Sequence, residues 1–268
     1  MSNQSYFDAM NYDKMILEYG RPEQFESEIA RMPRDRLHAL QNDRFLRVVA
    51  FAWEIPFYQR HWGEAGITPD DIQSIEDIGK LPPYSKEDLM ASVEAHPPIG
   101  DFHGLDTYSP EDRPPLVFQT TSGTTGRPQP LLFGPKSREI QNLLLARFYA
   151  MQGIRQEDVI HSVYGHGMVN GGHYVRESVI HWTGAQLLSA GTGIETRSAN
   201  QVQLMKDFGA TAIIGFGDYI TYLSGVARKE GLEPGCDINI RVISGHMGSE
   251  APETISRAWG GAEVFDWY

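Results

Sequence analysis

The stretch from Leu116 to Leu132 reads L-V-F-Q-T-T-S-G-T-T-G-R-P-Q-P-L-L and decides how the rest of the chain is interpreted. Its apolar start, Leu116 to Phe118, predicts a buried strand that opens into a loop rich in hydroxyl groups and glycine. Gly123 and Gly126 allow positive φ and close backbone approach, so successive N–H groups can point at one anion. The hydroxyl donors are Thr120, Thr121, Ser122, Thr124 and Thr125. The loop is therefore predicted to hold phosphate.

Two other interpretations of this loop are weaker. A solvated Ser/Thr/Gly linker is not usually bounded by Val-Phe on one side and Leu-Leu-Phe on the other. The P-loop of kinases and ATPases requires G-x-x-x-x-G-K-[ST], whereas Arg127 follows Gly126 here and no Lys-Ser/Thr pair comes directly after that glycine.

Composition limits the class of protein. The 268 residues are 41% hydrophobic, which is enough for a sizeable globular core. Lys and Arg number 23 against 35 Asp and Glu, and the net charge of −12 argues against a nucleic-acid or anionic-membrane partner. The single cysteine, Cys236, excludes internal disulfides and a Cys-based zinc cluster, and it is expected to be an inert, partly buried thiol.

The sequence also carries expectations about location. No apolar run approaches the ~18 residues of a membrane span, and the polar start M-S-N-Q-S lacks a signal-peptide core. A cytoplasmic protein without a membrane partner is the default expectation.

The first part of the chain, residues 1–115, is predicted to be an N-terminal helical region. Residues 1–22 are expected to form a surface arm, and Pro22 to Trp53 to form two helices broken near Met32-Pro33. Ser85 has the residue type and acidic neighbours of a helix N-cap. Residues 92–115 carry five prolines and are interpreted as a crossover loop.

The second part, residues 116–268, alternates strands and helices. Strands are predicted at Val159–Val163, Ala185–Leu188, Thr211–Gly215, Asn239–Ile243 and Ala262–Phe265, and helices at Ser137–Gln152, Tyr174–Trp182, Asn200–Phe208, Tyr219–Arg228 and Glu250–Trp259. This order predicts an α/β fold with mostly parallel sheets flanked by helices. Ligands bind at the carboxyl ends of such strands, which singles out loops 120–128, 164–172, 215–218 and 244–252.

The segment T-S-G-T-T-G-R-P, Thr121 to Pro128, resembles the phosphate-binding loop of the adenylate-forming superfamily, which includes the acyl- and aryl-CoA synthetases. Many members have a lysine after the proline, whereas Gln129 stands here. This departure points to the phenylacetate-CoA ligase branch, in which the position also varies. The segment W-E-I-P-F-Y-Q-R-H-W, Trp53 to Trp62, is also similar to that branch. The resemblance extends over about residues 50–268. It implies the large N-terminal domain of the adenylate-forming fold.

Y-G-H-G-M-V-N-G-G, Tyr164 to Gly172, resembles the Y-G-Y-G-x-F-x-G-G segment that lines the acid pocket of aryl-CoA ligases, with His166 replacing the second aromatic residue. The resemblance implies an acid pocket from Tyr164, His166, Gly167, Met168, Gly171 and Gly172. An imidazole there could donate to a carboxylate or a polar group, or it could simply be packed in the turn. A metal site from His161, His166, His173 and His181 fits no familiar spacing, and none is predicted.

S-G-H-M-G-S-E-A-P, Ser244 to Pro252, resembles the G-A-E-P-type loop beside the adenine and the acid, with an extra Ala251 before the proline. The resemblance implies nucleotide contacts from Gly248, Ser249 and Glu250, and acid contacts from Gly245 and His246. From the residues alone, Ser249 and the neighbouring acids also suit a helix N-cap.

F-D-W-Y, Phe265 to Tyr268, is similar to the start of the family's D-x-Y-G-x-[ST]-E segment, which implies nucleotide contacts from Asp266, Trp267 and Tyr268. The family's glutamate, catalytic lysine and small C-terminal domain are expected beyond Tyr268. No catalytic residue is therefore assigned, and the chain is expected to be a truncated part of such an enzyme.

The resemblance implies ATP-dependent activation of an aryl or small carboxylic acid to an acyl-adenylate, followed by transfer to coenzyme A. The implied cofactors are ATP, Mg²⁺ and coenzyme A, with Thr121 to Arg127 around the phosphates. Alternatives are an adenylate-forming transferase with another acceptor, and a non-catalytic nucleotide- or acid-binding module. An α/β-hydrolase is disfavoured because no G-x-S-x-G occurs. The sequence leaves open the acid, the acceptor and the oligomeric state, with a homodimer as one option, and the 268-residue chain is expected to turn over slowly at most.

Overall fold

The computed structural model describes residues 5–123 and 128–267. The chain divides into two compact units, and each is described by itself. One unit contains residues 1–10, 27–118 and 123–135, and the other contains residues 11–26, 119–122 and 136–268.

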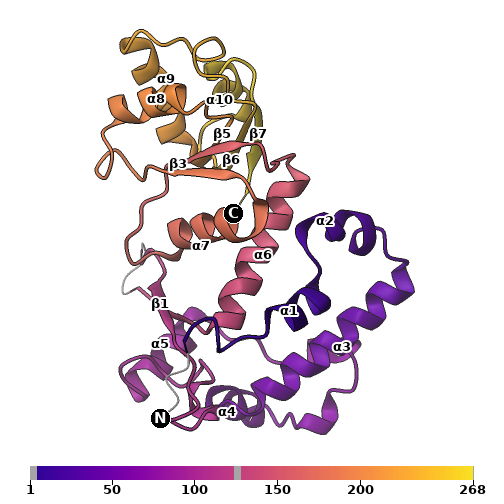
Figure 1. Ribbon diagram of the computed structural model, residues 1–268. Coiled ribbons are helices and arrows are strands. Elements are labelled where there is room, and N and C mark those ends of the chain that lie inside the picture. The colour runs from indigo at the N-terminus through magenta and orange to yellow at the C-terminus, as the bar shows by residue number, and fades with distance from the viewer. Residues whose placement is uncertain (1–4, 124–127, 268) are drawn as a thin grey trace. The chain divides into compact units, whose positions relative to one another are not determined.

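The first unit is mainly helical (Figure 1). Its helices are α3 (Arg34–Ala52), α4 (Pro56–Glu64), α5 (Lys86–Ala95) and the 3₁₀ segments η2 (Pro69–Asp71), η3 (Ile75–Lys80) and η4 (Leu105–Thr107). Helix α3 begins after Met32-Pro33, as predicted. Helix α5 begins after Ser85, whose hydroxyl accepts from the Asp88 N–H while the Asp88 carboxylate accepts from the Ser85 N–H. This capping box confirms the predicted N-cap.

Strands β1 (Val117–Thr120) and β2 (Pro130–Phe133) form a two-stranded sheet. The prediction that Leu116 to Phe118 form a buried strand was only half right. Leu116 is 41% exposed and Phe118 is 45% exposed, and the strand begins at Val117. A two-stranded sheet has few neighbours with which to cover the side chains of its strands.

The second unit is built on a five-stranded parallel sheet with the order β4-β3-β5-β6-β7. Its strands are β3 (Val159–Ser162), β4 (Gln186–Ser189), β5 (Ala212–Phe216), β6 (Val242–His246) and β7 (Glu263–Asp266). Parallel pairing is continuous, with Ile160 beside Ala212, Ile214 beside Ser244, and Gly245 beside Asp266. The predicted parallel α/β sheet is confirmed, although β6 starts three residues later than expected.

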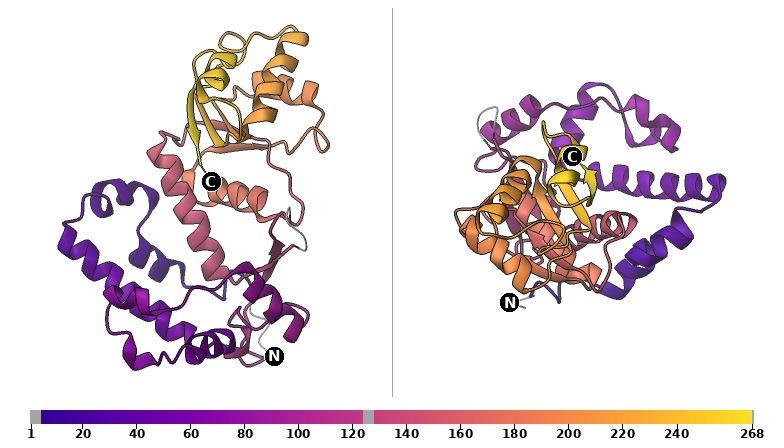
Figure 2. Two further views of the ribbon diagram at one scale, coloured as in Figure 1. Left: turned by 180° about the vertical axis from the view of Figure 1, so that it is seen from behind. Right: turned by 90° about the horizontal axis from the view of Figure 1, so that it is seen from above.

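Helices cover both faces of this sheet (Figures 1 and 2). On one face, α8 (Ser198–Asp207), α9 (Gly217–Lys229) and α10 (Pro252–Ala258) pack on the sheet through an almost wholly apolar cluster. On the other face, α6 (Pro135–Met151), α7 (Asn170–Ser178) and the π-helical turn η5 (Val179–Thr183) cover a second cluster. The central strands are buried from both sides, which explains their apolar sequences.

The face under α6 and α7 also contains a buried polar network. Arg138 is fully buried and donates to the carboxylate of Glu177 and to the side-chain carbonyl of Asn170. Glu139, also fully buried, accepts from the Trp182 indole at 3.0 Å and lies 3.1 Å from His181 Nδ1. These bonds join α6 to α7 and η5.

Two N-terminal segments belong to this second unit: α1 (Tyr12–Tyr19) and α2 (Pro22–Gln24), which the π-helical turn η1 (Phe25–Ile29) follows. Within the expected surface arm, Tyr12 to Tyr19 form a helix. Met15 is buried, and the Arg147 guanidinium of α6 donates to the Gly20 carbonyl while lying over the Phe25 ring at 4.9 Å. A local N-cap also starts α1, since the Asn11 side chain accepts from the Lys14 N–H at 2.8 Å.

Within the described ranges, no helix combines the length and apolar character needed to cross a membrane. Cys236 is exposed rather than partly buried as expected.

Candidate functional site

The carboxyl ends of four neighbouring strands meet at one edge of the parallel sheet. Their aromatic side chains form a connected row. The ring centroid of Tyr164, which follows β3, lies 4.9 Å from that of Phe216 on β5, and the Phe216 centroid lies 6.2 Å from that of His246 on β6. On its other side, Tyr164 lies 6.4 Å from Trp267, which follows β7. Residues predicted separately from loops 164–172, 215–218 and 244–252 therefore share one edge, where parallel sheets bind ligands.

Close packing of backbones at this edge requires glycine. A Cβ atom on Gly245 would lie 1.8 Å from the Gly215 carbonyl oxygen, and one on Gly172 would lie 2.0 Å from the Gly165 carbonyl oxygen. Both residues were predicted from the sequence to line an acid pocket. In the structure, these two positions require glycine because a neighbouring backbone carbonyl, and not a ligand, leaves no room for a side chain. Gly167 and Gly171 have open space where a side chain would be.

The loop after β3 carries the predicted acid-binding residues. Tyr164 is buried, and burial raises the pKa of its hydroxyl. His166 is half-buried, with Nε2 3.2 Å from the Ser189 hydroxyl, and burial lowers the pKa of its imidazole. Met168 is 55% exposed, and its carbonyl accepts from the Thr120 N–H at 2.8 Å. The end of β1 is thus tied directly to this loop, which brings two predicted binding segments together.

The loop after β4 also reaches this edge, and the sequence analysis did not name it. The Glu195 carboxylate accepts from the Thr192 N–H and hydroxyl, and the hydroxyl bond lowers the pKa of Glu195. A Cβ on Gly165 would lie 3.0 Å from a Glu195 carboxylate oxygen, so this acid borders the predicted acid loop. The rule that ligands bind at the carboxyl ends of parallel strands could have identified it, since β4 was predicted.

Gln201 of α8 holds this β4 loop in place. Its fully buried side-chain amide donates to the carbonyls of Gly191, Thr192 and Thr196, and its carbonyl oxygen lies 2.9 Å from His161 Nε2. Such a network orders the loop without contributing a group to the edge itself.

Residues 247–250 form a turn after β6. The Met247 side chain is buried in the apolar cluster, and its N–H donates to the Asp266 carboxylate at 3.0 Å. Gly248 has a φ of 64°, which favours glycine. The helix N-cap predicted at Ser249 and Glu250 was wrong: α10 begins at Pro252, and its N-cap, Ala251, makes no side-chain cap. Proline at the first helical position fixes the start two residues later than expected.

Trp267 points back into the molecule. Its backbone N–H donates to the Gly245 carbonyl at 2.9 Å, and its indole N–H donates to the Ser244 hydroxyl at 3.0 Å. The indole lies 6.2 Å from the Phe148 ring and 6.3 Å from the Tyr174 ring. It is therefore part of the cluster under α6 and α7.

Five predicted site residues, Thr124, Thr125, Gly126, Arg127 and Tyr268, lie outside the described residues. Of the rest of the phosphate segment, Ser122 is exposed and Gly123 has a φ of 68°, as a turn that uses glycine requires.

The four histidines that might have suggested a metal have separate surroundings. His161 pairs with Gln201 and His181 with Glu139, whereas the His166 and His173 rings lie 5.6 Å apart. In the described part of the chain, no three His, Cys, Asp or Glu side chains are grouped to hold a metal ion.

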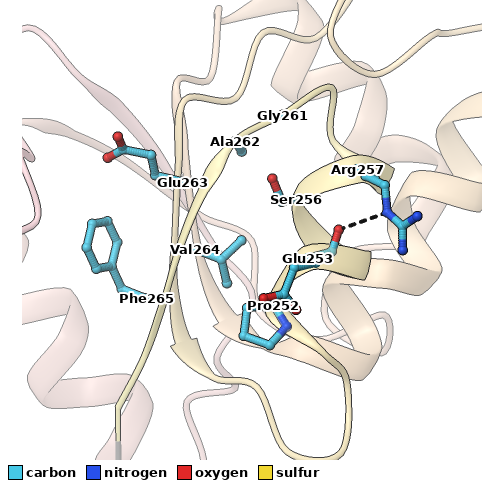
Figure 3. A pocket seen from close by; sticks show the side chains of 9 residues that line it. All are labelled: Pro252, Glu253, Ser256, Arg257, Gly261, Ala262, Glu263, Val264 and Phe265. Carbon is cyan, nitrogen blue, oxygen red and sulfur yellow. Dashed lines mark hydrogen bonds between the residues drawn. The ribbon is translucent and has the colours of Figure 1, made fainter.

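A hollow of roughly 600 Å³ lies elsewhere, beside the edge strand β7 and α10 (Figure 3). Figure 3 shows Val264 pointing toward α10, where the Arg257 guanidinium donates to the Glu253 carbonyl at 3.2 Å. None of the predicted site residues lines this hollow.

The chain is similar in sequence to known ligases. The chain is 31% identical over 214 residues to phenylacetate-coenzyme A ligase of Thermus thermophilus, an alignment that covers 78% of this chain and 44% of that protein. Identity to the Escherichia coli ligase of the same name is 28% over 225 residues, covering 81% of this chain and 47% of that protein. These similarities support the adenylate-forming, phenylacetate-CoA ligase-like family for this chain.

The similarity extends to solved structures of this family. A 2-hydroxyisobutyryl-CoA ligase in the postadenylation state, in complex with 2-HIB-AMP, superimposes with a TM-score of 0.77 at 28% identity, covering 88% of this chain and 49% of that one. No family model matches the chain. The chain spans about half the length of the curated relatives that it matches.

Proposed function

We propose that this protein activates a carboxylic acid by adenylation and then passes the acyl group to coenzyme A. A carboxylate oxygen attacks the α-phosphorus of ATP, the bond to pyrophosphate breaks, and an acyl-adenylate forms. The thiol sulfur then attacks the acyl carbon and AMP leaves. Most of the barrier reduction in such a reaction comes from positioning and charge stabilisation.

One observation carries the proposal. The loops after β3, β5, β6 and β7 converge in the row Tyr164, Phe216, His246 and Trp267, where the sequence predicted acid and nucleotide contacts. The names of the relatives support it: two are phenylacetate-coenzyme A ligases, and a solved structure contains an acyl-adenylate, 2-HIB-AMP.

The residues present fit an acid and a nucleotide better than they fit a metal ion. The edge offers exposed backbone at Gly167 and Gly248, a neutral imidazole at His166 and apolar surface at Phe216. The phosphate segment Thr121 to Arg127 remains a prediction from the sequence. Because the described residues contain no group of metal ligands, no step is assigned here to Mg²⁺.

Calorimetric titration of the purified 268-residue chain with a non-hydrolysable acyl-adenylate analogue, an acyl-sulfamoyl adenosine, tests this proposal. We expect the analogue to bind at least roughly tenfold more tightly than AMP or the free acid alone, because it engages both halves of the site at once. Equal affinity for the analogue and for AMP would contradict the proposal that the chain has an acid-binding site.

A second measurement separates the acceptors. Acid-dependent exchange of pyrophosphate into ATP reports adenylation, and thioester formation on addition of coenzyme A reports the second step. Exchange that requires a carboxylic acid but gives no thioester would point to another acceptor. ATP hydrolysis that is indifferent to any acid would contradict the proposed reaction.

A further inference from the structure

We propose that Glu195 is a positioning residue for the acid half of the site. Its carboxylate holds the backbone of the loop after β3, at His166, in the conformation that receives the acyl group of the adenylate. This inference rests on the proposed function, and it adds to that function a residue that none of the predicted contacts includes.

The Glu195 carboxylate joins two loops that follow neighbouring strands. Within its own loop, after β4, it accepts from the N–H and the hydroxyl of Thr192. In the loop after β3, it accepts from the backbone N–H of His166. Because β3 and β4 pair in parallel, both loops begin at the same edge of the sheet. Three donors on one carboxylate fix its position more firmly than a single hydrogen bond would.

Two glycines leave room for the Glu195 side chain. A Cβ atom on Gly191 would lie 3.1 Å from Glu195 Cδ, and one on Gly165 would lie 3.0 Å from a Glu195 carboxylate oxygen. Gly191 also has a φ of 70°, which favours glycine. The side chain therefore passes between the backbones of the two loops and ends beside the residue that directly precedes His166.

The loop that carries Glu195 is itself anchored to the sheet. The N–H groups of Ala190 and Gly191 donate to the Ser162 carbonyl on β3, at 3.1 and 3.2 Å. Gln201, which is fully buried, donates to three carbonyls of the same loop. A carboxylate on such a loop is a preformed acceptor, so no free energy of ligand binding is lost in ordering it.

The loop that Glu195 holds is the one predicted to enclose the acid, through Tyr164 and His166 among others. Farther along this loop, the Gly167 carbonyl oxygen lies 2.7 Å from His173 Nε2. The bond to Glu195 fixes the backbone before that point, where the two predicted side chains begin. Without this bond the loop would have more conformations, and ordering them would reduce the affinity for the acyl group.

The charge of Glu195 also acts on the His166 ring. Burial, together with His173 and Arg176, lowers the pKa of the imidazole, whereas the negative charge of Glu195 raises it. Removal of that charge should therefore lower the pKa of His166 further. This change reports the contact between the two loops in the absence of any ligand.

The test compares Glu195→Ala and Glu195→Gln with the unaltered 268-residue chain by calorimetric titration. The ligands are isobutyryl-sulfamoyl adenosine, phenylacetyl-sulfamoyl adenosine and AMP. In Glu195→Ala we expect the affinity for the tighter of the two analogues to fall roughly tenfold, the effect of losing a hydrogen bond to a charged group. The affinity for AMP should change by less than about twofold, because AMP has no acyl group. Glutamine has the same length and keeps an acceptor for the His166 N–H, so Glu195→Gln should restore most of the affinity.

The ratio of the two affinities remains informative even if a variant folds incompletely. Partial unfolding reduces the apparent affinity for the analogue and for AMP by the same factor, so their ratio is unchanged. Glu230→Ala is the matched control, because Glu230 is an exposed glutamate that directly follows α9, a helix that begins at the carboxyl end of β5 and runs away from it. This control should leave both affinities unaltered. In Glu195→Gln, the pKa of the His166 ring, measured by NMR, should be lower than in the unaltered chain.

Two negative results have different meanings. If neither analogue binds the unaltered chain more tightly than AMP, the proposed function fails, and the role of Glu195 fails with it. If an analogue binds the unaltered chain tightly and Glu195→Ala leaves its affinity relative to AMP unchanged, the acid site stands and the role of Glu195 is wrong. An unchanged His166 pKa in Glu195→Gln would likewise contradict the contact between the two loops and leave the acid site in place.

Discussion

The two faces of the five-stranded sheet each hold a histidine, and they perturb it in opposite directions. His161, under α8, is fully buried beside the neutral side chain of Gln201, and burial lowers its pKa to about 4. His181, an exposed residue of η5 on the other side, lies beside the buried carboxylate of Glu139 on α6, and that hydrogen bond raises the pKa of His181. Burial alone favours the neutral imidazole, whereas a buried carboxylate nearby favours the cation.

The difference extends to the whole of each face. The face under α8, α9 and α10 is an apolar core whose polar groups are few and neutral. The face under α6 and α7 combines aromatic side chains with Arg138, Glu139 and Asn142, all fully buried. Trp267 of the proposed site packs into this second face. The sheet thus has one face that mainly supplies stability and one whose polar and aromatic contacts position the binding edge.

The largest effect is expected for Trp259→Ala on the apolar face. Trp259 directly follows α10 and is fully buried in the apolar cluster, and its indole N–H donates to the Ile220 carbonyl. Removing this ring should reduce the free energy of unfolding by about 3–5 kcal/mol, measured by urea denaturation. Trp259→Phe keeps most of the apolar volume and should cost less. A loss below about 1 kcal/mol for the alanine variant would contradict the assignment of this face as the main source of stability.

The second prediction concerns acid and His161. The pKa of His161 in the folded chain, about 4, lies below the ordinary value of 6.5. Between these two pH values the unfolded chain therefore binds a proton that the folded chain does not bind. The free energy of unfolding is therefore unaffected by His161 above pH 6.5, and it decreases as the pH falls toward 4, by roughly 3 kcal/mol in total.

His161→Gln removes this titration and retains an amide able to bond Gln201. The stability of the variant should therefore decline less between pH 6.5 and 4 than that of the unaltered chain, as followed by urea denaturation at each pH. Parallel pH curves for the two proteins would show that His161 is not held neutral.

A smaller effect of opposite sign is expected on the other face. The raised pKa of His181 means that its pairing with Glu139 contributes stability that is fully present below pH 6.5 and is lost as the pH rises through the folded pKa. Glu139→Gln keeps an acceptor for the Trp182 indole but loses the charge, and it should cost about 2 kcal/mol. The His181 pKa, measured by NMR, should fall in this variant; an unchanged value would disprove the pairing.

The smallest predicted effect is that of Ser244→Ala. This change leaves the Trp267 indole N–H without its acceptor, at a cost of about 1 kcal/mol in urea denaturation. Trp267→Phe combined with Ser244→Ala should then show less than the sum of the two single losses, because the second change removes a bond already absent. If the losses in the free energy of unfolding were fully additive, Ser244 would not be coupled to Trp267.

Much of the fold followed from the sequence because parallel βα units have strong local signals. Apolar runs such as Ala212 to Ile214 lie on central strands buried on both faces, and the capping box at Ser85 starts a helix by local hydrogen bonds alone. Residues with weaker local signals were misjudged. Tyr12 to Tyr19 form a helix whose N-cap, Asn11, was not identified, and α10 starts at Pro252 rather than at the polar residues before it.

The candidate site was predictable only in part. Tyr164, His166, Gly245 and His246 were found by resemblance, and the structure brings the loops that carry them to one edge. The loop after β4 escaped notice because Ser189 and Glu195 belong to no recognisable motif. Their importance comes from position in the sheet, as does that of Gln201, which acts through the carbonyls of the loop that precedes α8.

The sequence by itself determined the alternation of strands and helices, the resemblance to a family, and the glycine-rich segments predicted to bind ligand, since periodicity and short motifs are properties of neighbouring residues. Only the tertiary structure decided which side chains share the binding edge, why Gly172 and Gly245 have no side chain, and which way Trp267 points. Those depend on backbones and rings from separate βα units that come within a few ångströms of one another, which no local pattern records.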